Sequence, residues 1–396
     1  MKPKIIFFLF MTSAVLVSCN SGSSSSSSNT PSAQAIPGSY VCLPSSLPTN
    51  SGSSSVKIAY AGNCAVESAL QSKSLQSMAV ALEKYSLQDD SNPESAFYNN
   101  CTGTPIQTNL QTGISFILTA AHCVTGTSSP KPAGLPTTAS NINTYVESDA
   151  HNQAWIYQGV NAGPLQVGDM TAEILAVYVP SQYCQSVAYT DIDGDGEYTC
   201  SGVGGRDIPY MNGDFAILKV KTLPNKTLSV ATNLKLAPSD FSLNSGISNL
   251  LVLGYGGTNP NGTVESQNPN NTQLNYINTQ YFGTNSYAGI SASTTIMNGY
   301  LVNGTYYSLI CGGDSGGGDF AWDGSSWNLV GVHSWGASGY PLRCGLYSSF
   351  YGYASNVSAD VRQFNNWIQT VLTKDTQITG CANLGSEYAC ISGSGI

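Results

Sequence analysis

The sequence predicts an all-β protein, and two observations lead to this. Only 9% of the 396 residues are charged, while glycine, serine, asparagine, threonine and tyrosine are abundant. Between residues 95 and 358, short apolar runs such as ISFILTA, AEILAVYV, DFAILKV, NLLVLGYG and WNLVGVHSWG alternate with Gly, Asn, Pro and Asp. Apolar runs bounded by turn-forming residues are typical of strands in a β-barrel or sandwich.

The first 18 residues predict an export signal. Lys2 and Lys4 precede an apolar run that is too short to span a bilayer as a helix. The run ends in LVSC, which resembles the lipobox of bacterial lipoproteins, so we expect Cys19 to carry lipid; ordinary cleavage nearby is the alternative. The Ser-rich residues 19–55 predict a tether between an anchor and a folded body. We therefore expect an outer-membrane or cell-surface lipoprotein, or a secreted protein.

The cysteine count supports export. The chain has 11 cysteines, and lipidation of one leaves an even set, which implies a disulfide framework. No C-x-x-C pair occurs, so a thiolate zinc site or redox motif is not expected. Two bridges are expected near the chain ends: Cys42–Cys64 and Cys381–Cys390.

Two helices are expected outside the strand pattern. Apolar positions recur at helical spacing in residues 64–86, which predicts a helix within an N-terminal extension, residues 56–94. A second helix is predicted over residues 358–372, where Ser358 can cap its start. Its apolar positions share one face: Val361, Phe364, Ile368 and Val371. A disulfide-closed tail, residues 374–396, follows.

One serine stands among glycines in SLICGGDSGGGDF, residues 308–320. Serine is a weak nucleophile at neutral pH and needs an adjacent base, usually histidine, and the chain has only 3 histidines. His122 stands in FILTAAHCV, where an apolar strand runs into two alanines, the histidine and a cysteine. The small residues let the ring lie against packed backbone. Cys123 can pin this turn, with Cys101 on the preceding strand as the expected partner.

The base needs a buried acceptor that fixes its tautomer. Asp214 in NGDFAILKV heads an apolar strand. Burial of its carboxylate costs several kcal/mol unless it is hydrogen-bonded, and a histidine partner would supply that bond. A turn aspartate at a strand edge is the alternative. Asp169 and Asp207 are weaker candidates because no comparable apolar run follows them.

TAAHC, DFAIL and GGDSGG, in the order His, Asp, Ser, resemble the motifs of the chymotrypsin/trypsin family of serine endopeptidases. The likeness covers residues 95–373 and implies two six-stranded antiparallel β-barrels with a C-terminal helix. It implies that Ser315 is the nucleophile, His122 the general base and Asp214 the group that orients the base. The N–H groups of Gly313 and Ser315 would form the oxyanion hole. No cofactor is required for this chemistry, and the expected partners are protein or peptide substrates.

The resemblance also implies a substrate pocket bracketed by a Cys311–Cys344 disulfide. Its base position is Leu309, and because leucine cannot neutralise a cation, Arg or Lys specificity is not expected. His333 stands where some relatives that cut after glutamate also carry histidine, so acidic and apolar preferences both stay open. A short edge strand would pair with the substrate backbone: Ser334, Trp335 and Gly336.

GDSGG also fits the G-x-S-x-G nucleophile elbow of α/β-hydrolases, with His333 as base and Asp319 or Asp323 as acid. That fold needs a helix after the serine, whereas the Asp323-Gly324 turn between two strand-like runs predicts a hairpin. A second alternative, of another class, is a catalytically silent member of the protease fold that serves in adhesion or binding.

The family's zymogens insert a new N-terminus, typically I-V-G-G, beside the aspartate before the serine, here Asp314. No such tetrapeptide stands upstream. A basic side chain is the alternative partner, and the chain has three arginines: Arg206, Arg343 and Arg362. The long segment between His122 and Asp214 predicts insertions in the first barrel.

One insertion, DIDGDGEYTC at residues 191–200, resembles a D-x-D-x-D-G calcium loop. Its alternating carboxylates could converge on one cation: Asp191, Asp193 and Asp195. The twelfth position is Gly202 and not glutamate, so the full EF-hand pattern fails. A Cys184–Cys200 disulfide would close this loop. A structural Ca²⁺ site and a solvated acidic turn both stay open.

The charge balance limits the partners. The formal net charge is −9 and no basic patch occurs, which argues against a nucleic-acid partner. Membrane contact is expected only through the lipid anchor, and we expect the folded body to be a monomer.

Overall fold

The structure of the chain is a computed structural model. Two compact units divide it, residues 1–30 and residues 31–396, and the fold below belongs to the second unit. The structure describes residues 30–41, 64–65, 74–86, 96–121, 123, 142–145, 154–159, 169–180, 189–191, 198–200, 214–245, 247–256, 274–284, 295–302, 305–307, 313–336, 356–376, 388–390 and 392–393.

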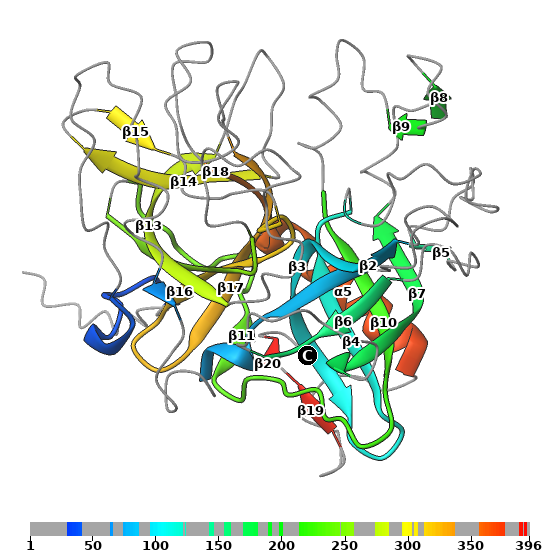
Figure 1. The fold of residues 1–396 in the computed structure, drawn as a ribbon. Helices are drawn as coiled ribbons and strands as arrows, with labels where there is room; N and C mark the ends of the chain where they lie inside the picture. Colours follow the sequence, from blue (N-terminus) through cyan, green and yellow to red (C-terminus); the bar gives the residue numbers. More distant parts are fainter. Residues whose placement is uncertain are drawn as a thin grey trace, which may run out of the picture. The chain divides into compact units, whose positions relative to one another are not determined.

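Six antiparallel strands close into a first barrel (Figure 1). In ring order they are β10 (Ala216–Thr222), β4 (Ile114–Thr119), β3 (Ala96–Asn109), β2 (Val80–Ser86), β6 (Ala154–Tyr157) and β7 (Ala172–Pro180). The pairing of β7 with β10 closes the ring. Two further strands attach to it, β5 (Ile142–Tyr145) to β7 and β19 (Tyr388–Cys390) to β3. A separate ribbon pairs β8 (Tyr189–Asp191) with β9 (Tyr198–Cys200).

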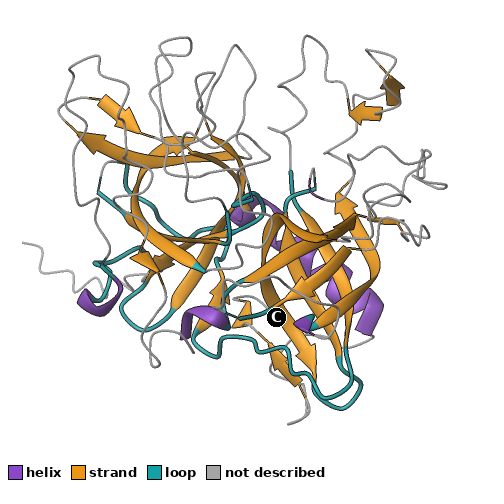
Figure 2. Cartoon of the chain, in the orientation of Figure 1, coloured by secondary structure: helices purple, strands orange, loops and turns teal. Residues whose placement is uncertain are grey.

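A second ring also has six antiparallel strands, drawn in orange with the rest in Figure 2. In ring order they are β12 (Asn249–Gly254), β16 (Gly318–Trp322), β17 (Trp327–Gly336), β18 (Asn356–Asp360), β14 (Thr295–Val302) and β13 (Asn275–Thr284). Four short strands attach to this sheet: β1 (Cys64–Ala65), β11 (Leu234–Leu236), β15 (Thr305–Tyr307) and β20 (Ser392–Gly393). The predicted pair of six-stranded barrels is therefore confirmed.

The apolar runs of the sequence form the barrel cores. Residues 116–119 of β4 and residues 216–218 of β10 are buried without alternation, which explains why these strands carry continuous apolar sequence. The helix α5 (Val361–Thr376) packs against Phe215, the residue before β10. The Phe215 ring lies 4.5 Å from the Phe364 ring and 5.2 Å from the Trp367 ring, measured between centroids. The C-terminal helix thus supports the residue next to Asp214.

Helix α5 confirms the predicted C-terminal helix, but its cap differs from the prediction. Ser358 lies within β18, and the helix begins three residues later. The Asp360 side chain accepts a hydrogen bond from the backbone N of Arg362 at 3.0 Å, which makes Asp360 the cap. Strand pairing of Ser358 with His333 and Ile296 holds that residue in extended backbone. No helix of the described residues is long and apolar enough to cross a membrane.

The predicted helix over residues 64–86 is wrong for most of its length. Residues 64–65 form β1, residues 74–76 form a single helical turn, and residues 80–86 form β2. Residues 78–82, MAVAL, are all buried, because β2 pairs with β3 on one side and β6 on the other. A continuous apolar run fits a buried strand as well as a helix, so its spacing did not decide between them. The first barrel therefore begins before residue 95.

The predicted tether is also wrong in part, because the segment of residues 31–41 contacts the second sheet. Ser32 forms a parallel bridge with Ser242, and the η1 turn (Gly38–Tyr40) follows. The Tyr40 ring meets Trp327 edge-on with centroids 5.4 Å apart, and its hydroxyl donates to Ser74 Oγ at 3.1 Å. The tail beyond α5 likewise adds β19 and β20 to the two sheets.

Candidate active site

Asp214 lies two residues before the start of β10 and is fully buried. Ser334 in β17 donates its hydroxyl hydrogen to Asp214 Oδ2 at 2.6 Å. This short bond to a buried carboxylate offsets part of the desolvation cost of that group. The sequence predicted that Ser334 belongs to a strand that pairs with the substrate backbone. It did not reveal that the Ser334 side chain binds Asp214. The bond ties the first barrel to the second.

The loop that carries Ser315 is packed tightly against the first barrel. Gly313 and Gly316 have φ angles of 96° and 83°, in the left-handed region that favours glycine. A Cβ at Gly316 would lie 2.1 Å from Thr119 Oγ1 and 2.3 Å from Thr102 O. The glycines around Ser315 are therefore required both by backbone conformation and by the close approach of β3 and β4.

Backbone hydrogen bonds hold this loop from both sides. Thr102 N in β3 donates to Ser315 O at 2.7 Å. From β17, His333 O accepts from Gly316 N at 2.7 Å, and His333 N donates to Gly317 O at 2.8 Å. The nucleophile candidate is thus fixed at the junction of β3 and β17.

His122 lies outside the described residues, but its chain neighbours are described. Ala121 is buried, and Cys123 forms a disulfide with Cys101 with an S–S distance of 1.96 Å, the pair that the sequence predicted. Cys123 Sγ lies 3.7 Å from Ser315 O, a contact rather than a hydrogen bond since a disulfide sulfur carries no hydrogen. On the other side, Thr119 pairs with Ala216, two residues after Asp214. The three sequence motifs therefore converge at one edge of the first barrel.

Asp314 is buried beside the turn that follows β12. Its Oδ1 accepts a hydrogen bond from Gly256 N at 2.8 Å. A Cβ at Gly254 would lie 1.9 Å from this oxygen, and one at Gly256 would lie 2.5 Å from it. Gly254 and Gly256 thus form a cradle for Asp314, a role that the strand-like pattern of this segment did not reveal.

Arg362 was one candidate partner for Asp314, and the structure places it elsewhere. Its Nε and Nη2 atoms each donate to the Asp360 carboxylate at 2.8 Å, and Nη1 donates to Phe241 O. A two-pronged bond of this kind fixes the guanidinium firmly. The other two candidates, Arg206 and Arg343, lie outside the described residues.

His333 is completely buried next to a carboxylate. Its Nδ1 lies 3.1 Å from Asp319 Oδ1 and 3.3 Å from Ser358 Oγ, and both partners are buried. Within the part of the chain that the structure describes, His333 Nε2 has no hydrogen-bond partner. Of the other predicted pocket residues, Trp335 and Gly336 end β17, while Leu309, Cys311 and Cys344 lie outside the described residues.

The segment after Ser315 is a hairpin, as predicted. Strands β16 and β17 pair antiparallel around residues 323–326, and Gly324 has a φ angle of 98°. Burial raises the pKa of Asp323, but hydrogen bonds from Asn328, Ser325 and Ser326 outweigh it and hold the pKa well below its usual range. Because a strand follows the serine, the nucleophile elbow of an α/β-hydrolase does not fit.

Other predicted sites fall largely on residues that the structure does not describe. Asp191 ends β8, while Asp193 and Asp195 lie outside the described residues. The described residues contain no group of three metal-ligating side chains. The predicted lipidation site, Cys19, lies outside the described residues, as does at least one cysteine of each remaining predicted pair: Cys42–Cys64, Cys184–Cys200, Cys311–Cys344 and Cys381–Cys390.

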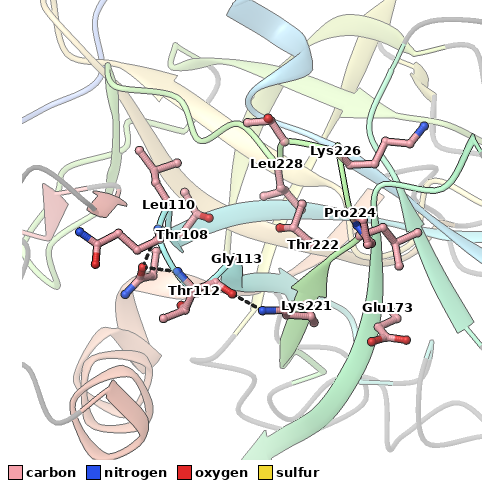
Figure 3. A pocket seen from close by; sticks show the side chains of 14 residues that line it. Thr108, Leu110, Thr112, Gly113, Glu173, Lys221, Thr222, Pro224, Lys226 and Leu228 are labelled. Carbon is pink, nitrogen blue, oxygen red and sulfur yellow. Dashed lines mark hydrogen bonds between the residues drawn. The ribbon is translucent and has the colours of Figure 1, made fainter.

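A hollow of about 730 Å³ lies at one end of β4 and β10 (Figure 3). The motifs that contain Asp214 and Ser315 lie at the other end of these two strands. At the end with the hollow, Lys221 pairs with Ile114, and the Lys221 ammonium donates to Thr112 O. The hollow is lined by residues 108–113, Glu173 and residues of the 221–228 segment. It is therefore separate from the edge where Asp214 and Ser315 lie.

A protein-family model described as Trypsin matches residues 181–368. The matched span contains Asp214 and Ser315 and begins after His122. No curated protein matches the chain. Together with the two barrels, the family match supports the resemblance to chymotrypsin/trypsin-like serine proteases.

Proposed function

We propose that this protein is a serine endopeptidase that hydrolyses peptide bonds through His122, Asp214 and Ser315. The observation that carries the proposal is the bonding of the Ser315 loop to β3, beside the residues that flank position 122. The buried Asp214, held by Ser334, supports the same arrangement. The trypsin-like family match supports a serine protease in general terms.

In the proposed reaction, His122 takes the hydroxyl proton of Ser315 as the serine oxygen attacks the acyl carbon of the substrate. Asp214 stabilises the imidazolium that forms. The backbone N–H groups of Gly313 and Ser315 bind the oxyanion of the tetrahedral intermediate. His122 then gives its proton to the leaving amine. In the second half of the reaction, water attacks the acyl-enzyme with His122 again as the base, and the acyl group leaves as Ser315 regains its proton.

The test of this proposal is hydrolysis of casein and of short fluorogenic peptides by the mature protein. We expect wild type to cleave and Ser315→Ala to lose activity by a factor on the order of 10⁶, as for other serine protease nucleophiles. A catalytically silent adhesin or binding protein on the same fold is the alternative. Equal rates for wild type and the folded Ser315→Ala protein would refute the protease.

We further propose that the enzyme is not specific for Arg or Lys and prefers either an acidic or an apolar side chain, and a specific observation supports the acidic candidate. The support is His333, whose Nδ1 faces Asp319 and whose Nε2 is buried without a partner among the described residues. When protonated, this ring offers an Nε2–H donor to a substrate carboxylate. Leu309 supports the second candidate, an apolar preference. Paired peptides with Glu or Gln at the cleaved position decide: we expect faster cleavage of the Glu peptide, and equal kcat/KM would exclude the acidic preference.

The remaining proposals concern location and metal. We propose export with a lipid on Cys19, which mass spectrometry of the mature N-terminus would detect. A structural Ca²⁺ held by Asp191, Asp193 and Asp195 would raise the Tm in calcium over that in chelator. An unchanged Tm would favour a solvated acidic turn. The folded body is proposed to be a monomer, and its partners are protein or peptide substrates.

A further inference from the structure

Thr102 occupies a central place between the two barrels. It lies in β3 next to Cys101, and its side chain is completely buried. Its own carbonyl accepts a hydrogen bond from Thr119 Oγ1 at 2.7 Å, and the neighbouring Gly103 pairs with Thr119 in the sheet. The strand therefore holds Thr102 in place without help from the Thr102 hydroxyl.

The Thr102 hydroxyl forms two hydrogen bonds outside its own strand. It donates to Gly313 O at 2.8 Å and accepts from Tyr255 N at 3.0 Å. The backbone N of the same residue donates to Ser315 O. One residue of the first barrel thus holds the carbonyl of Gly313 and the carbonyl of Ser315, the two residues whose N–H groups form the proposed oxyanion hole.

This bonding matters because Gly313 has little conformational restraint of its own. Its φ angle of 96° is one of several that glycine adopts readily. Oxyanion stabilisation depends on donors that stand in place before the charge develops, within roughly 3 Å of the oxygen. The bond from Thr102 to the Gly313 carbonyl fixes the peptide plane between Gly313 and Asp314, so it penalises rotations of that plane, which lies between the two N–H groups.

We propose that the Thr102 hydroxyl is a positioning group that holds residues 313–315 in the conformation required of the oxyanion hole. The inference rests on the proposed protease function. The bond from Tyr255 extends the support, because the next residue, Gly256, donates to the Asp314 carboxylate within the same loop. The hydroxyl thus links β3, the turn after β12 and the Ser315 loop.

The test compares three variants with wild type. Thr102→Val keeps the shape and removes the hydroxyl, and Thr102→Ser keeps the hydroxyl. Thr104→Val is the matched control, because Thr104 lies in the same strand, is equally buried, and its hydroxyl has no hydrogen-bond partner within the described residues. Peptide hydrolysis gives kcat and KM, with active sites counted by complete fluorophosphonate labelling.

We expect Thr102→Val to lower kcat about 10- to 100-fold, somewhat less than outright loss of an oxyanion donor, with KM changed by less than about twofold. Thr102→Ser and Thr104→Val should stay within about threefold of wild type. An unchanged kcat in Thr102→Val, an effect on KM alone, or an equal loss in Thr102→Ser would overturn the inference. If Thr102→Val does not fold, Thr102→Ala is judged by the same criteria. Absence of turnover in folded wild type would refute the protease itself, and this inference with it.

Discussion

Buried carboxyl groups are treated differently in two regions of this molecule. At the junction of the barrels, Asp214 accepts a hydrogen bond from Ser334, and Asp314 accepts one from Gly256. In β2 of the first barrel, Glu83 is just as buried, but neither of its oxygens has a hydrogen-bond partner in the described structure. Burial raises the pKa of Glu83 to about 8. The carboxylates of the proposed site thus accept hydrogen bonds, whereas ionisation of Glu83 in β2 lowers the stability of the fold.

The largest expected effect comes from a substitution of Asp214, at the junction of the barrels. Asp214→Asn keeps the size of the side chain but can present the wrong atom to the histidine. We expect kcat to fall about 10⁴-fold with little loss of Tm, as expected when the histidine is held in the wrong tautomer. Steady-state kinetics and thermal melting measure this. A variant within tenfold of wild type would remove Asp214 from the mechanism.

The second prediction concerns Glu83 and the dependence of the free energy of unfolding on pH. The pKa of Glu83 is about 8 in the folded chain against an ordinary value of 4.5, so the stability that the buried neutral acid allows is fully present below pH 4.5 and is lost as pH rises to about 8. At 1.36 kcal/mol per pH unit, the loss is roughly 4–5 kcal/mol. Between pH 5 and pH 8, urea unfolding should show wild type losing about 3–4 kcal/mol more stability than Glu83→Gln.

Glu173 supplies the matched control for that experiment, since it is exposed on β7 of the same barrel. Glu173→Gln should follow the pH dependence of wild type. If Glu83→Gln loses as much stability between pH 5 and pH 8 as wild type does, then Glu83 is not the buried acid that limits alkaline stability.

The glycine cradle of Asp314 can be broken directly. Gly254→Ala would place a methyl carbon 1.9 Å from Asp314 Oδ1, so either the carboxylate or β12 must shift. We expect a loss of about 2–4 kcal/mol in the free energy of unfolding, together with reduced kcat. Gly38→Ala is the comparison, because a Cβ at Gly38 would have no atom within 4 Å. A neutral Gly254→Ala would show that the cradle is not tight.

The smallest expected effect concerns Ser334. Ser334→Ala removes the donor to Asp214 Oδ2 and leaves the carboxylate to its other contacts. The loss of one hydrogen bond to a charged group is about 1.5–3 kcal/mol, so kcat should fall about 10- to 100-fold. Rescue by Ser334→Thr, which keeps a hydroxyl, separates this role from simple packing; an unchanged kcat in Ser334→Ala would remove the serine from the site.

The sequence predicted those features that local pattern encodes. The apolar runs that follow Asp214 and Ser315 are strands of the barrels, because a strand buried on both faces must be largely apolar. The Asp323-Gly324 hairpin was predicted from turn chemistry, and the Cys101–Cys123 pair from its place beside a turn. These predictions depend only on residues near one another in the chain or on one strand pair.

The predictions that failed depend on tertiary contacts. Residues 80–86 became a strand because β3 and β6 flank them, and a continuous apolar run could not show this. Asp360 replaced Ser358 as cap because pairing with β14 and β17 extends β18 past Ser358. The bonds from Thr102 to Gly313 and from Ser334 to Asp214 join residues more than 100 positions apart, so no local pattern encodes them.

The most direct test of the central claim is covalent labelling of the mature protein with a fluorophosphonate, followed by mass spectrometry of the labelled peptide. The account predicts one phosphonyl group on Ser315 in wild type, none in Ser315→Ala, and much slower labelling in His122→Ala. A folded wild-type protein that takes up no label, or one labelled at the same rate without His122, would contradict it.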